Sequence, residues 1–381
     1  MELLVVGGGA AGVATAYMAA RMGYGDRVAV LEQRYLGYGS MTRNGGRFRV
    51  HFFSRENTLF AIESAKRLLE VPRVTGVNPV IVRGGYLWLF SREESLKAFR
   101  RANTEIWGPL GVPVEILPVS EVAEKYPVLN LQGFLAAAYG RQNGSYHHDY
   151  LMLAMATYAA RHGVSFVENA RVRRIVVSGG RVRGVEVEGV GVVEAENVVV
   201  AAGAWSKELL STANVDVPLT PYRKSLLVTE PYRYTLKPLV ILFEEGSYLG
   251  QTPKGEIMAS RRVKDPVTTD MSGVSLLWLS ETAKLLATML KGGHMLRIMR
   301  VWSGIYNTTP DHSHLLGRDP EWPEGLYVNT GYSGHGVMMA PYAGELLVKL
   351  VFENREHEHL RLFSPTRFKE GKPIKEQLVI G

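Results

Sequence analysis

The sequence contains no cysteine among its 381 residues. Disulfide bonds, thiolate metal sites and cysteine nucleophiles are therefore excluded. The absence of cysteine is compatible with a reducing compartment, and we expect a cytoplasmic protein.

Long apolar runs are also missing, since no stretch of about 18 apolar residues occurs without interruption. We therefore predict no membrane-spanning helix, and the sequence leaves peripheral association with a membrane open. The apolar opening segment, residues 1–20, lacks the basic residues that begin a secretory signal peptide, so we interpret it as part of the fold.

Charge of one sign is not concentrated anywhere. Lys and Arg number 44 against 37 Asp and Glu, a net charge of +7, and the charges are scattered. A nucleic-acid-binding protein needs a dedicated basic face with interleaved aromatic residues, so we predict no nucleic-acid partner, and we expect no metal site. The remaining composition, 46% hydrophobic and 21% charged, is typical of globular proteins, and the length predicts about two domains.

The clearest motif stands at the start of the chain. Residues 2–6 form a short apolar run typical of a buried parallel strand, residues 13–22 have a helical pattern, and residues 27–31 form a second apolar run. Between the first strand and the helix lies Gly7-Gly8-Gly9-Ala10-Ala11-Gly12, which fits the dinucleotide-binding pattern G-x-G-x-x-G.

Each position of this motif has a physical role. Gly7 permits a tight turn, Gly9 lets the backbone approach a pyrophosphate, and Gly12 lets the helix and strand pack closely. The helix N-terminus presents free N–H groups to the anion. Glu32 ends the second strand, where its carboxylate can accept hydrogen bonds from ribose hydroxyls. The motif predicts dinucleotide binding but does not distinguish FAD from NAD.

Two later segments favour a flavin. Residues 198–206, VVVAAGAWS, form an apolar strand that ends in small residues, which lets the backbone pass close to a planar group. Residues 329–341, NTGYSGHGVMMAP, place small residues before a helix, whose positive end can stabilise the charge of a reduced flavin. Each segment taken alone is also consistent with ordinary structure: a buried strand entering a turn, and a helix cap.

A further segment, residues 37–49, holds Arg43, Arg47 and Arg49 close behind the second strand. Planar guanidinium groups bind carboxylates and phosphates through two parallel hydrogen bonds. We expect one of these three arginines to be functional and the others to be structural.

The rest of the chain alternates between helical and extended patterns. Helices are predicted over residues 57–69, 93–107, 149–162, 276–290 and 336–352. Extended segments or strands are predicted over residues 80–90, 165–200, 219–263 and 326–330. A hairpin turn is predicted at Gly179-Gly180, and the chain after residue 363 is expected to be polar, irregular and exposed.

The fold class that follows is α/β, or α+β overall, with a Rossmann-like FAD-binding domain interleaved with an antiparallel-sheet substrate domain. The FAD-binding domain is expected over residues 1–80, 145–215 and 305–356. The substrate domain is expected over residues 81–144 and 216–304, and a C-terminal tail over residues 357–381.

These motifs, in this order, resemble the glycine oxidase and sarcosine oxidase group of FAD enzymes in the D-amino-acid oxidase superfamily. The likeness spans nearly the whole chain and is strongest to the FAD-bearing β subunit of archaeal dye-linked L-proline dehydrogenases. Besides the glycine motif, it rests on Gly39-Ser40-x-x-Arg43 with Arg49, Gly85-Tyr86-Leu87, Trp302-x-Gly304-x-Tyr306 with Thr309-Pro310-Asp311, Ser333-Gly334-His335-Gly336, and Pro365-Thr366-Arg367-Phe368.

The resemblance implies a set of site residues. Those that would hold FAD are Gly7, Gly9, Ala10, Ala11, Gly12, Glu32, Gln33, Ser40, Arg43, Val172, Ala202, Gly203, Trp205, Gly304, Gly334, His335, Gly336, Val337 and Met338. On the substrate side, Arg49 matches an arginine that binds the substrate carboxylate in sarcosine oxidases. Tyr306 would face the substrate, and His335 is a candidate base.

Departures from the family pattern refine this prediction. Gly304 stands where monomeric sarcosine oxidase attaches FAD to a cysteine, so FAD is expected to be non-covalent. Ala259 or Ser260 stands where that oxidase has a lysine that helps oxygen react, which favours a dehydrogenase. Tyr306 replaces the arginine that glycine oxidase uses for carboxylate, which weakens a glycine oxidase assignment.

The reaction implied by the resemblance is oxidation of a small amino acid or secondary amine, such as L-proline or sarcosine, to its imine. Hydride would pass to flavin N5, and the electrons would continue to a dye, quinone or protein acceptor. Three alternatives stay open: an oxygen-using oxidase of sarcosine, glycine or D-amino acids, a flavin-bearing subunit that needs a partner subunit, and an NAD-dependent dehydrogenase. The later glycine-rich segments argue against the last, and a homo-oligomer is also left open.

Overall fold

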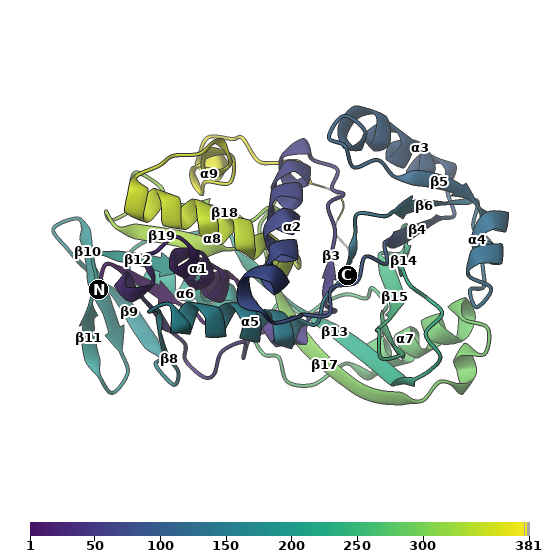
Figure 1. The fold of residues 1–381 in the computed structure, drawn as a ribbon, viewed down its shortest axis with the longest axis horizontal. Coiled ribbons are helices and arrows are strands. Elements are labelled where there is room, and N and C mark those ends of the chain that lie inside the picture. Colours follow the sequence, from purple (N-terminus) through teal and green to yellow (C-terminus); the bar gives the residue numbers. More distant parts are fainter. Residues whose placement is uncertain (377, 379–381) are drawn as a thin grey trace.

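A six-stranded sheet with the order β18-β19-β12-β1-β2-β8 lies at one end of the molecule (Figure 1). The computed structural model describes residues 1–376 and 378. The strands of this sheet are β1 (Leu3–Val6), β2 (Val28–Leu31), β8 (Ser165–Val167), β12 (Asn197–Val200), β18 (Leu315–Gly317) and β19 (Leu326–Thr330). All neighbouring pairs are parallel except β18 with β19. The four residues of β1, LLVV, are all buried because both faces of this sheet are covered.

Four helices form the layer on one face of this sheet. They are α1 (Ala10–Arg21), α2 (Arg55–Thr75), α5 (His148–Arg161) and α8 (Gly336–Glu353). α1 and α8 contact the strands and each other, and α2 and α5 pack beside them. A glycine lets α1 and α8 approach closely, since a Cβ on Gly344 would stand 2.8 Å from the backbone oxygen of Ala14. The predicted strand–turn–helix–strand order of residues 2–31 is confirmed.

A small three-stranded sheet and helix α6 (Ser206–Ser211) cover the opposite face. The small sheet, in the order β11-β10-β9, contains β9 (Val172–Ser178), β10 (Arg181–Val187) and β11 (Gly191–Glu194). Successive side chains of β1 point to opposite faces of the sheet, so Leu3 packs among the helices and Leu4 packs against the small sheet. Gly179 and Gly180, with φ of 61° and 73°, form the turn between β9 and β10, as predicted.

A second large sheet of eight strands has the order β17-β13-β16-β15-β14-β4-β6-β5. Its strands are β4 (Tyr86–Phe90), β5 (Glu115–Pro118), β6 (Ala136–Gly140), β13 (Thr220–Pro231), β14 (Leu239–Leu242), β15 (Ser247–Gln251), β16 (Glu256–Ser260) and β17 (Ile298–Thr308). Only β14 with β4 is a parallel pair. Helices α3 (Glu93–Ala102), α4 (Val119–Lys125) and α7 (Leu276–Met289) lie at this end of the molecule (Figure 1).

One largely parallel and one largely antiparallel sheet confirm the predicted mixed fold class. The strands of the first sheet come from residues 3–31, 165–200 and 315–330, and those of the second from residues 86–140 and 220–308. The chain therefore passes between the sheets more than once, and the domain boundaries drawn from the sequence stay a prediction.

The shorter elements are two strands and five helical turns. They are β3 (Arg47–Phe48), β7 (Gly144–Ser145), the 3-10 turns η1 (Gly25–Arg27), η2 (Ser40–Arg43), η4 (Gly203–Trp205) and η5 (Gly293–Met295), and the π-helical turn η3 (Asn103–Trp107).

The C-terminal segment differs from the expectation of an exposed, irregular tail. It contains α9 (Glu358–Leu362) and α10 (Thr366–Lys369). Arg367 is only 2% exposed, and its Nε lies 2.8 Å from a carboxylate oxygen of Asp311. The carboxylate of Glu376, which is 4% exposed, accepts hydrogen bonds from the backbone N–H groups of Phe53 and Ser54. The prediction is wrong because charged side chains can be buried once each has a partner, and the sequence does not reveal those partners.

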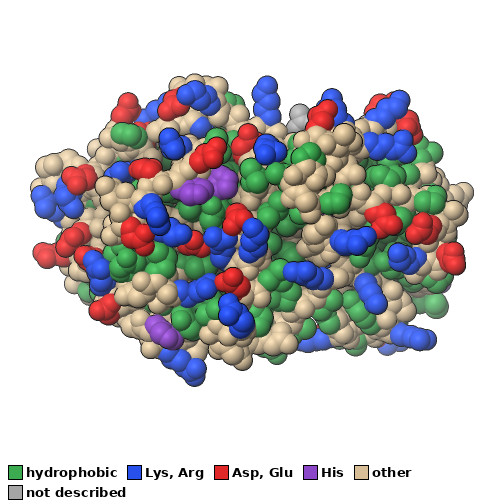
Figure 2. All heavy atoms as spheres, turned by 45° about the horizontal axis from the view of Figure 1, so that its top comes forward, with side chains coloured by type: hydrophobic (Ala, Val, Ile, Leu, Met, Phe, Trp, Pro, Cys, Tyr) green, Lys and Arg blue, Asp and Glu red, His purple; other side chains and the backbone are tan. Residues whose placement is uncertain are grey.

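The surface carries charges of both signs. Figure 2 shows lysine and arginine side chains interspersed with aspartate and glutamate over the visible face. None of the helices within residues 1–376 and 378 has both the length and the apolar character needed to cross a bilayer.

Candidate active site

A deep pocket lies where the carboxyl ends of β1, β2, β12 and β19 meet strands β4, β13, β14, β15 and β17 of the eight-stranded sheet. It encloses about 2180 Å³ of space, its mouth included. Ligands of open parallel sheets bind beyond the carboxyl ends of the strands, and this space can hold a dinucleotide together with a small substrate. All the residues predicted to contact cofactor or substrate line it except Gly12. The roles assigned to the individual residues stay predictions.

The glycine turn after β1 has the local geometry that its sequence indicates. Gly7 has a φ of +115°, and a Cβ there would stand 2.5 Å from the backbone oxygen of Ala201. A Cβ on Gly12 would stand 1.9 Å from the backbone oxygen of Gly7, so Gly12 permits close packing of helix against turn rather than facing the pocket. No atom lies within 4 Å of the Cβ position of Gly9, which leaves space for a ligand beside the backbone.

Glu32 follows β2 and is held in place by the backbone. Its Oε2 accepts a hydrogen bond from the N–H of Gly8 at 2.8 Å, and its Oε1 accepts one from the N–H of Arg34 at 2.9 Å. Burial raises the pKa of Glu32, and these backbone donors oppose that change. Gln33 and Val172, the latter from β9, line the pocket nearby. The carboxylate therefore lies fixed at the wall where the ribose was predicted.

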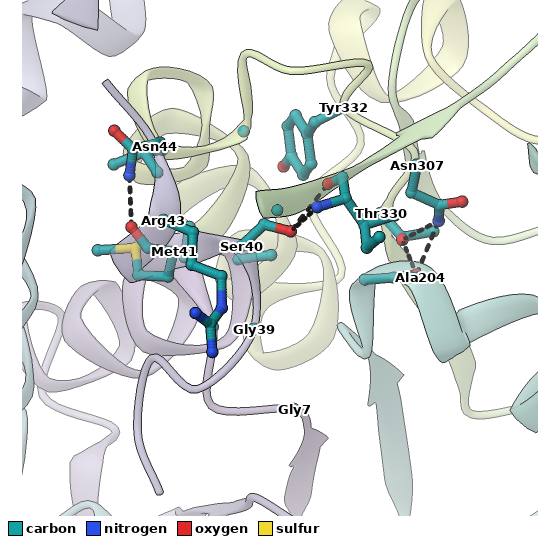
Figure 3. Close-up of a pocket in the computed structure, with 18 of the residues that line it drawn as sticks. Gly7, Gly39, Ser40, Met41, Arg43, Asn44, Ala204, Asn307, Thr330 and Tyr332 are labelled. Atoms are coloured by element: carbon teal, nitrogen blue, oxygen red, sulfur yellow. Dashed lines mark hydrogen bonds between the residues drawn. The ribbon is translucent and has the colours of Figure 1, made fainter. Parts of the chain in front are cut away.

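The turn η2 connects the nucleotide end of the pocket to β17. The hydroxyl of Ser40 donates to the backbone oxygen of Ile305 and accepts from its N–H, both at 2.8 Å (Figure 3). The indole of Trp302 donates to the backbone oxygen of Arg43 at 2.8 Å. Gly304 lies opposite, where a Cβ would stand 3.3 Å from the Cβ of Arg43. This close approach explains why a side chain at position 304 would press on η2.

The turn after β12 is fixed from the side of β17 and β19. The Nδ2 of Asn307 donates to the backbone oxygen of Gly203 at 2.7 Å (Figure 3). The hydroxyl of Ser206 donates to that of Thr330 at 3.0 Å. Ala202, Gly203 and Trp205 are held at the pocket wall as a result.

The loop before α8 carries the strongest conformational constraint in the pocket. Gly331, Ser333 and Gly334 all have a left-handed φ, of 74°, 51° and 98°. A Cβ on Gly334 would stand 2.2 Å from the ring of Tyr306, so only glycine fits there. The loop delivers the first residues of α8, an 18-residue helix, to the pocket. The free N–H groups of its first turn make this wall electropositive.

Several buried polar atoms at the pocket have no hydrogen-bond partner among the described residues. They include the Nε of Arg43, the Oδ1 of Asn307 and the Nε2 of His335. Buried polar groups without a partner are uncommon in proteins, and a bound ligand is one way to complete them. Together with the open side of Gly9 and the end of α8, they fit a dinucleotide that carries a polar ring system.

The predicted catalytic residues meet on the far side of the pocket. The Nη1 of Arg49 donates to the backbone oxygen of His51 at 2.9 Å, its Nη2 donates to that of Leu378 at 2.6 Å, and its guanidinium lies 4.0 Å from the ring centroid of Phe52. Burial raises the pKa of Tyr306 to about 12. Burial also lowers the pKa of His335 well below its usual range, so its imidazole is neutral.

The sequence did not point to the tyrosines that line the same end of the pocket. Tyr86 comes from β4, Tyr146 follows β7, and Tyr248 comes from β15. Burial raises the pKa of each, so all three are neutral hydroxyl groups at ordinary pH. Only Tyr86 lies in a segment, residues 85–87, that the family resemblance had singled out.

The sequence also did not point to Lys224, which puts a cation in this wall although Ala259 and Ser260 carry none. Ser260 turns to the backbone of Ser225, but Lys224 of β13, which pairs with Gly304, lines the pocket. The Nζ of Lys224 lies 2.5 Å from the carboxylate of Asp265, and burial lowers its pKa. The sequence could not show this, because it does not reveal which strand lies across from residue 304.

Comparisons with known proteins agree with this geometry. The family model for DAO, FAD dependent oxidoreductase, matches residues 2–350. The sarcosine oxidase subunit beta of Rhodobacter capsulatus is 25% identical over 389 residues, which cover 100% of this chain and 91% of that protein. The glycine oxidase of Geobacillus kaustophilus is 28% identical over 378 residues, covering 96% of this chain and 97% of that one.

Among solved structures, that of the L-proline dehydrogenase from P. horikoshii superposes with a TM-score of 0.91 at 29% identity, covering 97% of this chain and 98% of that one. The predicted cofactor, FAD, and the predicted superfamily are therefore confirmed, and an NAD-dependent dehydrogenase is set aside. Because the family match extends over most of its length, the chain belongs to the DAO family of FAD-dependent oxidoreductases.

Proposed function

We propose that the protein is a FAD-dependent dehydrogenase that oxidises a small amino acid or secondary amine to its imine. The observation that carries this proposal is the buried guanidinium of Arg49, which faces the same pocket as the N-terminus of α8. A carboxylate bound by Arg49 would lie between a cation and the predicted flavin wall. Relatives named for sarcosine, glycine and L-proline support a substrate that combines an amine with a carboxylate.

The side chains of the pocket would orient the substrate and exclude water. Arg49 would bind the carboxylate, and the buried Tyr86 and half-buried Tyr306 would surround the amine and favour its neutral form. The imidazole of His335 is neutral and its Nε2 has no hydrogen-bond partner among the described residues, so it would hydrogen-bond the amine. FAD, when bound, supplies the acceptor for the hydride that leaves the α-carbon.

We place a dye, quinone or protein acceptor ahead of oxygen. Lys224 does put a cation in the pocket wall, which favours an oxidase because a cation stabilises superoxide. Its ammonium, however, lies 2.5 Å from Asp265, whose carboxylate offsets the positive field. An oxygen-using oxidase is therefore the second candidate.

A partner subunit is part of the proposal. The relative in Rhodobacter capsulatus is named as a subunit. The C-terminal segment, which was expected to be irregular and exposed, packs on its own chain. We expect the isolated chain to bind and reduce FAD, and a partner to affect the second half-reaction.

Anaerobic titration tests the proposal. The purified FAD-loaded protein is mixed separately with L-proline, sarcosine, glycine, D-amino acids and dicarboxylic amines, and the ~450 nm band is followed. Bleaching by an amino acid or amine is the expected result. A flavin that none of these compounds bleaches would contradict it. Mixing the reduced protein with oxygen or with a dye then separates the two candidates, because a dehydrogenase reoxidises faster with the dye.

A further inference from the structure

Two arginines from one extended segment face the pocket, and only one has a role in the proposed reaction. Arg47 begins the two-residue strand β3, Arg49 follows that strand, and both residues line the pocket. Phe48 between them points into the core and is 1% exposed.

Arg47 is half-buried at the pocket wall, and none of the described residues gives it an acidic partner. Its Nη2 donates to the backbone oxygen of Gln251 at 3.0 Å and lies 3.6 Å from the Sδ of Met258. Its Nε has no hydrogen-bond partner, and within residues 1–376 and 378 no carboxylate lies within 4.0 Å of its guanidinium. A guanidinium with a buried, unpartnered Nε on a pocket wall can bind an anion that enters the pocket.

The position of Arg47 is built into the neighbouring strand. A Cβ on Gly250, in β15, would stand 2.8 Å from the Nη2 of Arg47, so a glycine there makes the room that the guanidinium occupies. The residue is therefore placed at the pocket wall by a specific gap in the sheet.

The two guanidinium groups serve different parts of the pocket. That of Arg49 lies over Phe52 and is directed to the backbone of the C-terminal segment, whereas that of Arg47 is directed to the end of β15. Tyr86 lies near both, since each arginine counteracts the rise in pKa that burial causes in its hydroxyl. One carboxylate bound by both forks is therefore a poorer fit than two carboxylates on either side of Tyr86.

On the basis of the proposed function, we infer that the substrate carries two carboxylates, one bound by Arg49 and the second by Arg47. The chemical class is a dicarboxylic amino or imino acid whose oxidisable carbon lies between the two anchors. A substrate with one carboxylate would leave the Arg47 guanidinium without a counter-charge once cofactor and substrate fill the pocket.

Binding of two unreactive probes tests this inference. Thiodiacetate and (methylthio)acetate share a thioether and differ by one carboxylate, and each perturbs the visible spectrum of bound FAD when it fills the substrate site. We expect thiodiacetate to bind the FAD-loaded protein ~100-fold more tightly, as buried charge pairs allow. Arg47→Gln should abolish that preference and leave the affinity for (methylthio)acetate unchanged.

Variants of Arg47 and a matched control make the result decisive. Arg47→Lys keeps the charge without the planar fork, so it should retain part of the preference for thiodiacetate. This variant also tests the inference if Arg47→Gln fails to fold. Arg183, exposed on β10, gives the control Arg183→Gln, which should behave like the unaltered protein.

Equal affinity for both probes, failure of both to bind, or a preference that survives in Arg47→Gln would each overturn the inference. The proposed function is judged separately by the bleaching titration. Bleaching by amines with one carboxylate alone would therefore leave that function standing while rejecting the second anchor.

Discussion

At the scale of the residue, Arg49 carries the proposed specificity for a carboxylate. Arg49→Gln should raise KM for the substrate that bleaches the flavin by ~100-fold, because a charge-assisted bond in a buried site is lost. The effect on kcat should be smaller, since carboxylate binding is present in both the ground state and the transition state. Steady-state kinetics with a dye acceptor measure both constants.

The comparison variant is Arg49→Lys, which keeps the charge and should recover part of the affinity. FAD content and the midpoint of thermal unfolding establish that each variant is folded. An unchanged KM in Arg49→Gln would remove this residue from the substrate site.

Most of the pocket lining could be predicted at this scale because the glycine motifs indicate where the backbone makes tight turns. Gly7 and Gly334 need a left-handed backbone, and only certain turns require that. Tyr146 and Tyr248 could not be predicted, because a tyrosine in or beside a strand has the same local pattern whether it faces a core or a cavity. Lys224 was missed for the same reason.

At the scale of the element, the loop before α8 determines where that helix begins. Gly334→Ala should lower the free energy of unfolding by ~1–3 kcal/mol, because the φ of +98° is strained for alanine and its Cβ would meet the ring of Tyr306. Displacement of the ring should also weaken substrate binding. Urea unfolding and substrate titration measure the two effects.

Gly371 offers a matched control. Its φ is +66°, but no atom lies within 4 Å of its Cβ position, so Gly371→Ala carries only the backbone strain. The two variants should therefore differ in stability. Equal losses would show that the contact with Tyr306 is absorbed by small shifts.

The existence and type of most elements could be predicted from apolar periodicity, and β19, residues 326–330, begins and ends where the pattern does. The order of strands in the sheets could not. β14 pairs with β4 across a long stretch of sequence, with Leu239 beside Tyr86, and no local pattern specifies such a partner. The irregular C-terminal prediction fails for a related reason, because the partner of Arg367 lies at Asp311.

At the scale of the whole molecule, buried histidines make stability depend on pH. Burial lowers the pKa of His51 and His359 to about 4, and those of His314 and His335 well below their usual range. The unfolded chain, with histidine pKa values of ~6.5, binds more protons below that pH. The contribution of these histidines to the free energy of unfolding should therefore be fully present above pH ~6.5. It should fall as the pH drops, by about 1.4 kcal/mol per pH unit for each histidine.

His314 isolates one of these contributions. It is fully buried between the rings of Tyr332 and Phe363, and neither ring nitrogen has a hydrogen-bond partner among the described residues. His314→Leu should reduce the pH dependence of the unfolding free energy by about 1.4 kcal/mol per unit, measured by urea titrations between pH ~7 and ~5. The exposed His294 supplies the control His294→Leu, and equal slopes in both variants would contradict the prediction.

The strand order also determines when the protein can acquire its cofactor. In the sheet, Leu3 lies beside Asn197, and Val198 lies beside Leu326. A ribosome delivers these strands one after another, at roughly 5–20 residues per second. β1 therefore keeps an unpaired edge until residue 197 has emerged, and the electropositive end of α8 emerges later still. FAD capture consequently belongs to the last stage of synthesis, and added FAD cannot rescue a chain truncated before α8.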